Sequence, residues 1–114
     1  MDRTTMKKAY KDSGRPMGVF IIKNTQNDRL YIDCSIDLPA RINRHKAELR
    51  FRSHRNRELQ EAWDLLGEQT FKFEILDLMD NEENAGADIG RELKVLQEMW
   101  IGRLKDEGHA VVAL

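Results

Sequence analysis

Apolar positions near the start of the chain follow the pattern of β-strands. Two β-rich runs occupy residues 17–23 and 30–32, and the first holds four consecutive apolar residues from Val19. Between them, residues 24–28 read Asn-Thr-Gln-Asn-Asp, a turn composition, because Asn and Asp tolerate left-handed backbone and bond to their own main chain. The pattern predicts an antiparallel hairpin.

The pattern then changes to that of an amphipathic helix. Four positions share one helical face, at i, i+4, i+7 and i+11: Leu38, Ile42, His45 and Leu49. Asp37 suits the N-cap position, and Pro39 falls in the first turn, where proline is tolerated. His45 is therefore expected on the inner side of this helix.

Three further elements complete the expected fold. A second helix is predicted over residues 59–66, ending at Gly67, and a third strand over residues 71–75, where Phe71, Phe73 and Ile75 would form a buried face. After a polar loop at residues 81–88, a last helix has its inner side marked by Ile89, Leu93, Leu96, Trp100 and Leu104. The order β-β-α-α-β-α predicts an α+β fold with a small three-stranded antiparallel sheet flanked by helices.

The remaining segments are expected to be extensions of this domain. Residues 2–12 favour a short helix that residues 12–16 break, so residues 1–16 are interpreted as an N-terminal extension. The domain itself is expected over residues 17–107, and residues 108–114 are interpreted as a C-terminal tail.

Composition places the chain among ordinary soluble domains. Its 114 residues suit one core, with 40% hydrophobic and 34% charged residues. No apolar run has membrane-spanning length, and the polar, basic N-terminus is not a secretory signal. The single cysteine, Cys34, is expected to be a buried, inert thiol. A cytoplasmic location is the simplest expectation.

Positive charge is concentrated in one segment of a chain whose net charge is −1. Residues 41–57 contain one acid, Glu48, and seven basic residues: Arg41, Arg44, Lys46, Arg50, Arg52, Arg55 and Arg57. A local positive field attracts phosphates even when the whole molecule is slightly acidic. The alternative is a solvated helix face without a ligand.

Two triplets and the residues that follow them give the chain a family resemblance. Gly18-Val19-Phe20 and Tyr31-Ile32-Asp33 lie in the two predicted hairpin strands, and they are followed by Arg41, His45, His54, Gln97 and Trp100. Residues 22–25, 54–63, 67–76 and 100–101 add to the match. The chain resembles the GIY-YIG nuclease family, and most closely its small stand-alone bacterial members. The resemblance implies hydrolysis of nucleic-acid phosphodiester bonds with one divalent metal ion.

Several of the family's active-site positions are altered. Phe20 stands where the family has a tyrosine that helps to deprotonate or orient the attacking water, whereas the second tyrosine is kept as Tyr31. Gln97, three residues before Trp100, stands at the position of the metal-binding glutamate, and a neutral amide is a poor sole ligand for Mg²⁺. Asp33 replaces a glycine. We expect it at a solvent-facing strand end, the alternative being a carboxylate that repels phosphate or binds a metal ion.

Three basic or titratable residues match family positions around the cleft. Arg41 matches the arginine that stabilises charge on the scissile phosphate, a role that suits a guanidinium; the alternative is a surface ion pair. For His45 a core or rim position is favoured over a catalytic one, and His54 could lie near a helix cap.

Three functions follow from these observations. The first is a catalytically impaired nuclease-like protein that binds nucleic-acid phosphates, DNA more than RNA, through a basic helix face and needs no cofactor. The second is an active endonuclease that uses Mg²⁺ or Mn²⁺. The third is a protein-interaction module without nucleic-acid binding. We prefer the first, and the oligomeric state is left open.

Overall fold

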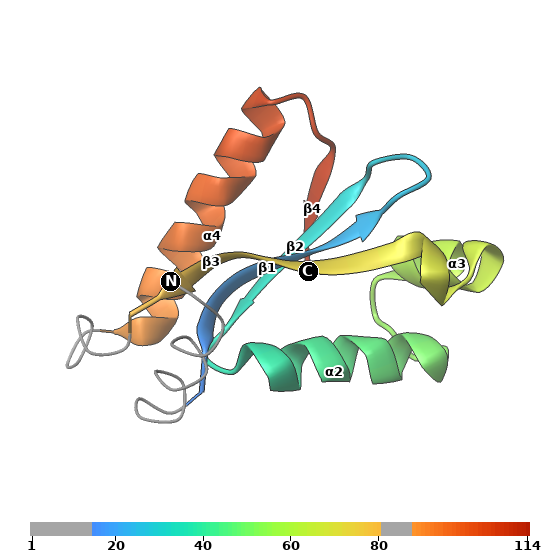
Figure 1. Cartoon of the computed structure of the whole chain (residues 1–114), viewed down its shortest axis with the longest axis horizontal. Coiled ribbons are helices and arrows are strands. Elements are labelled where there is room, and N and C mark those ends of the chain that lie inside the picture. Colours follow the sequence, from blue (N-terminus) through green and yellow to red (C-terminus); the bar gives the residue numbers. More distant parts are fainter. Residues whose placement is uncertain (1–14, 81–87) are drawn as a thin grey trace.

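The structure is a computed structural model that describes residues 15–80 and 88–114. The helix expected over residues 2–12 and most of the expected 81–88 loop lie outside these residues. The elements along the chain are β1 (Met17–Asn24), β2 (Leu30–Ser35), α2 (Leu38–Arg50), α3 (Arg57–Leu66), the short 3-10 helix η1 (Glu68–Thr70), β3 (Phe71–Met79), α4 (Ile89–Asp106) and β4 (Val111–Ala113). The α+β fold and the order of the predicted elements are confirmed (Figure 1).

The sheet has one strand more than the sequence predicted. Its order is β3-β1-β2-β4, with β1 antiparallel to both β2 and β3, and β4 parallel to β2. The expected tail therefore contains an edge strand, and the sheet is mixed. The prediction missed β4 because a three-residue strand is too short to show a periodic pattern.

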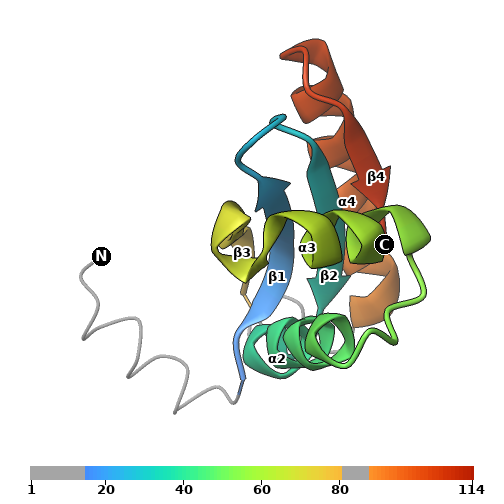
Figure 2. The same ribbon diagram turned by 90° about the vertical axis from the view of Figure 1, so that its right-hand side faces the viewer.

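Helices cover both faces of the sheet. Helices α2 and α3 lie on one face and α4 on the other (Figures 1 and 2). Alternation along β1 and β2 divides the core accordingly. Phe20, Ile22 and Tyr31 belong to the cluster with Leu38 and Leu49 of α2. The strand residues that alternate with these three point to the other face of the sheet and pack with α4.

The third strand is less buried than its pattern indicated. Phe71 is buried, but Ile75 is 49% exposed, so the prediction of a buried face was wrong at this position. Strand β3 forms an edge of the sheet, and its register against β1 shifts between Val19 and Phe20. Side chains on an edge strand beside such an irregularity are less completely covered.

Side chains cap the three longer helices. Asp37 accepts a hydrogen bond from the backbone N–H of Ala40 (3.1 Å), which confirms it as the N-cap of α2. Asn56 and Asp88 serve α3 and α4 in the same way. No helix within the described ranges is both long and apolar enough to cross a membrane.

Candidate active site

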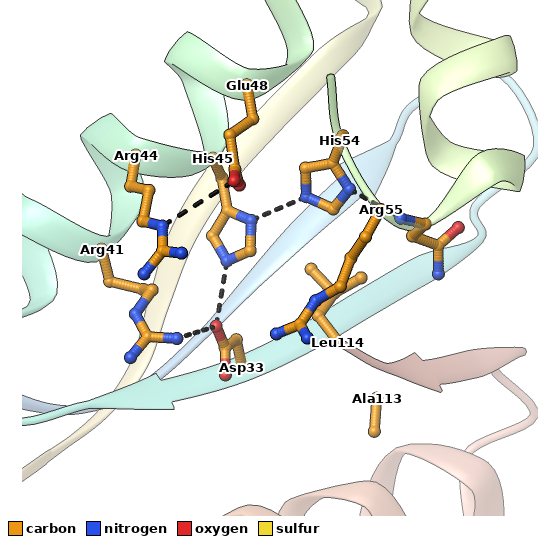
Figure 3. A pocket seen from close by; sticks show the side chains of 10 residues that line it. Asp33, Arg41, Arg44, His45, Glu48, His54, Arg55, Ala113 and Leu114 are labelled. Atoms are coloured by element: carbon orange, nitrogen blue, oxygen red, sulfur yellow. Dashed lines mark hydrogen bonds and ion pairs between the residues drawn. The ribbon is translucent and has the colours of Figure 1, made fainter. Parts of the chain in front are cut away.

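A cleft of about 380 Å³ opens between α2, the loop that follows it and the β2–β4 side of the sheet (Figure 3). Strand β2 contributes Asp33, and α2 contributes Arg41, Arg44, His45 and Glu48. His54 and Arg55 come from the α2–α3 loop, and the chain around β4 closes the remaining side with Ala113 and Leu114. Three residues proposed from the sequence for catalysis, Arg41, His45 and His54, therefore meet here.

A directed chain of hydrogen bonds crosses the floor of the cleft. The backbone N–H of Asn56 donates to His54 Nδ1 (3.1 Å), so this nitrogen carries no proton and a neutral ring must carry it on Nε2. His54 Nε2 then donates to His45 Nδ1 (2.8 Å), and His45 Nε2 donates to Asp33 Oδ2 (2.9 Å; Figure 3). Each ring is therefore assigned the neutral tautomer that carries its proton on Nε2. Burial, with a smaller contribution from His45, lowers the pKa of His54 and favours this neutral form.

Asp33 is fixed inside the cleft, which corrects the expectation of a solvent-facing strand end. It is 4% exposed, and its Oδ1 accepts the backbone N–H of Cys34 at 2.8 Å. Oδ2 accepts a hydrogen bond from His45 and another, at 3.4 Å, from Nη1 of Arg41. Strand alternation explains this, because residue 33 lies on the same face as Tyr31. The alternative reading, a carboxylate within the site, is the one that the geometry supports.

Phe20 lies directly opposite Asp33 in the register of β1 and β2. Its ring is fully buried and tilted against the His45 ring, with 5.7 Å between centroids. Two departures from the family triplets are thus neighbours in space, packed on the same histidine. Phe20 offers no proton donor or acceptor at this position.

Tyr31, at the position of the family's second tyrosine, makes its hydrogen bond outside the cleft. The hydroxyl of Tyr31 donates to Glu58 Oε1 (3.1 Å), and Glu58 is also paired with Arg29. Burial, and then the charge of Glu58, raise the pKa of Tyr31 to about 12, so its hydroxyl stays protonated. Sequence reasoning missed Glu58, because nothing in the pattern indicates which strand residue meets the first turn of α3.

Gln97 points inward, as its helical position predicted, but it does not line the cleft. It is 2% exposed on the face of α4 that packs on the sheet, and its Oε1 has no hydrogen-bond partner among residues 15–80 and 88–114. A buried oxygen without a hydrogen-bond partner is available as a ligand to a cation, yet Mg²⁺ prefers carboxylate oxygens. Glu98, the next residue, is exposed. This position therefore does not fit the metal ion that the family implies.

A second group could supply metal ligands. Ligand atoms of His45, Glu48 and His54 lie within 4.8 Å of one another, and the Asp33 bond to His45 resembles the carboxylate that orients many metal-binding histidines. However, a metal ion on His54 Nε2 would require a proton on Nδ1, where the N–H of Asn56 already points. As arranged, the hydrogen-bonded chain suits these side chains better than an ion does.

The basic residues of segment 41–57 do not form a single surface. Arg41, Arg44 and Arg55 line the cleft, where Arg44 is 3.8 Å from Glu48. Lys46 instead lies 5.0 Å above the ring of Phe73 on β3, and Arg50 pairs with Glu68 of η1 at 2.9 Å. The expected basic face is thus divided between the cleft and the β3 side of α2.

Comparison with known proteins assigns the family. The sequence profile of the GIY-YIG catalytic domain matches residues 16–99. The fold is similar to a mutant of the catalytic domain of the intron endonuclease I-TevI, with 26% identity, a TM-score of 0.64, and coverage of 79% of this chain and 84% of that one. It is also similar to the catalytic domain of the homing endonuclease I-TevI, with 22% identity, a TM-score of 0.67, and coverage of 86% and 99%. No curated protein matches the chain significantly. The chain belongs to the GIY-YIG family.

Proposed function

We propose that this chain is a nuclease-like domain that binds nucleic-acid phosphates at the cleft and that its cleavage of phosphodiester bonds is impaired. The observation that carries the impaired cleavage is the position of Asp33. Its carboxylate lies against Arg41 and His45, the side chains that the family resemblance assigns to the reacting phosphate. A fixed anion already satisfies these donors, and it repels a phosphate that approaches them.

Acid–base chemistry at the cleft is also weakened. Phe20 has no hydroxyl, and the hydroxyl of Tyr31 is committed to Glu58. A positioned acid or base typically contributes roughly 10²–10⁴-fold to a rate. Gln97, at the position of the family's metal ligand, is a neutral amide outside the cleft lining, so it provides no anionic ligand for an ion that would stabilise charge on the phosphate.

Binding does not require the groups that Asp33 occupies. Arg55 lines the cleft with no carboxylate partner among the described residues, and Arg44 makes only a long surface contact with Glu48. Guanidinium groups bind phosphate oxygens through paired N–H donors. The similar structures are catalytic domains of endonucleases, which supports nucleic acid as the ligand class.

The alternative is an active metal-dependent endonuclease. The His45, Glu48 and His54 group favours it, because two imidazoles and a carboxylate could hold a divalent ion if the Asn56 contact to His54 were broken. Under this alternative, cleavage would depend on added metal and would be lost in Glu48→Gln.

A cleavage assay with supercoiled plasmid, in Mg²⁺ or Mn²⁺ and with chelator controls, tests the proposal. We compare the native chain, the Phe20→Tyr/Gln97→Glu double variant, and a triple variant that also carries Asp33→Gly. Cleavage should be negligible in the native chain and should rise most in the triple variant, because only that variant also frees Arg41 and His45. Thermal melting and anisotropy with labelled DNA verify folding and binding.

Efficient cleavage by the native chain, abolished by Asp33→Asn or Glu48→Gln, would support the alternative. Absence of DNA and RNA binding at low salt would contradict both and favour an interaction module.

A further inference from the structure

Helix α2 ends in a hydrogen-bonded turn formed by Phe51 and Arg52. The backbone N–H of Arg52 donates to the carbonyl of Leu49 (3.2 Å), and the N–H of Ser53 donates to that of Glu48 (2.8 Å). This pair of bonds defines a Schellman motif, whose C′ residue adopts left-handed backbone. Arg52 holds that position with a φ of 57°.

An arginine is an unfavourable choice at this position. Glycine is the usual C′ residue because left-handed backbone brings a Cβ too close to the neighbouring carbonyl. The Schellman motif also commonly packs an apolar C″ residue, but here that residue is Ser53. The sequence therefore keeps an arginine where helix termination alone favours glycine, and such conformations concentrate at functional sites.

Phe51, the neighbouring residue, is presented to solvent. It is 81% exposed and is the only aromatic side chain among the exposed large hydrophobic residues of the described ranges. By helical spacing it lies seven residues after Arg44 and three after Glu48, on the side of α2 that lines the cleft. The turn thus adds one exposed aromatic ring, followed directly by Arg52, where α2 ends on the side of Arg44 and Glu48.

We propose that the Phe51–Arg52 turn is a contact site for single-stranded nucleic acid, in which Phe51 stacks on an unpaired base and Arg52 binds an adjacent phosphate. The inference rests on the proposed function and specifies its substrate class. An aromatic ring can stack on a base face only where that face is not already stacked in a duplex. Arg52 next to the ring, together with Arg44 and Arg55 in the cleft, favours a polyanion over an apolar protein surface.

Fluorescence anisotropy with one labelled oligonucleotide sequence, as a single strand and as a duplex, tests the stacking contact. Phe51→Ala should weaken single-strand binding roughly tenfold, whereas Phe51→Trp should retain it. Duplex binding should change little in either variant. Leu65→Ala is the matched control, because Leu65 is an equally exposed apolar residue (83%) on α3, outside the basic segment.

Arg52→Gly separates the role of this residue in binding from its role in folding. The substitution removes the unfavourable left-handed arginine, so the melting temperature should rise. Single-strand affinity should fall several-fold because a phosphate contact is lost. A purely structural arginine would not combine higher stability with weaker binding.

Two results would overturn this inference alone: native binding that Phe51→Ala leaves unchanged, or a preference for duplex that persists in both Phe51 variants. A native chain that binds neither form at low salt would instead remove the proposed function and this inference together.

Discussion

Asp33 is the residue whose removal should most clearly reveal how the cleft is held together. Replacing it with asparagine keeps the shape but replaces one carboxylate oxygen with an amide donor that cannot accept from His45 or Arg41. Hydrogen bonds to a buried charge contribute about 1.5–3 kcal/mol, so we expect Asp33→Asn to lower the free energy of unfolding by roughly this amount in urea titrations. Asp28→Asn, at an exposed ion pair with Lys23, is the control. Equal effects of the two variants would contradict the assigned network.

Tyr31 provides a spectroscopic test of the buried network on the α3 side. Burial and Glu58 raise its pKa to about 12, whereas an unfolded tyrosine ionises near pH 10. Stability from this group is therefore present below pH 10 and declines as pH rises toward 12. In a Tyr10→Phe background, absorbance titration should show one tyrosine with a high pKa, and Glu58→Gln should lower it partway. Titration near pH 10 before unfolding would contradict the contact.

Prediction from the sequence succeeded for residues whose environment depends on local spacing. Helical periodicity placed His45 and Gln97 inward, and the structure buries both. It failed for Asp33 because the predicted strand run stopped at residue 32, whereas β2 continues to Ser35, and because the partners of Asp33 belong to the next helix. The Tyr31–Glu58 contact, 27 residues apart in the sequence, was beyond a periodic pattern for the second of these reasons.

At the scale of elements, the glycine of the first triplet is explained by strand packing. A Cβ built on Gly18 would lie 1.9 Å from the backbone carbonyl oxygen of Asp77 on β3. Gly18→Ala must therefore push β1 and β3 apart beside the register shift, and we expect it to cost about 1–3 kcal/mol of unfolding free energy. Gly102→Ala, in α4, where an added Cβ would have no described atom beyond its own helix turn and chain neighbours within 4 Å, should instead stabilise by about 0.5–1 kcal/mol. Denaturant unfolding of both variants measures the difference, and similar changes would contradict it.

Elements with a long amphipathic pattern were predictable, whereas β4 was not. The 18 residues of α4 repeat their apolar positions over several turns, so that helix could be recognised without knowing its partner. Strand β4 is defined by its parallel pairing with β2, in which Leu30 lies opposite Val111. Pairing between segments so distant in sequence is set by the assembled sheet and leaves little trace in three residues.

The whole molecule is nearly neutral, but the basic residues of segment 41–57 lie on two different sides of α2. We expect only those at the cleft to contribute to nucleic-acid binding. Arg44 and Arg55 face the cleft, whereas Lys46 and Arg50 contact Phe73 and Glu68 on the β3 side. Each phosphate contact contributes about 0.7–0.9 to the slope of log affinity against log salt. Arg44→Ala/Arg55→Ala should therefore reduce that slope by roughly 1.4–1.8. Lys46→Ala/Arg50→Ala removes the same total charge and should leave the slope nearly unchanged. Anisotropy titrations across a salt series distinguish the two, because equal reductions would mean that nucleic acid responds to total charge and not to the cleft.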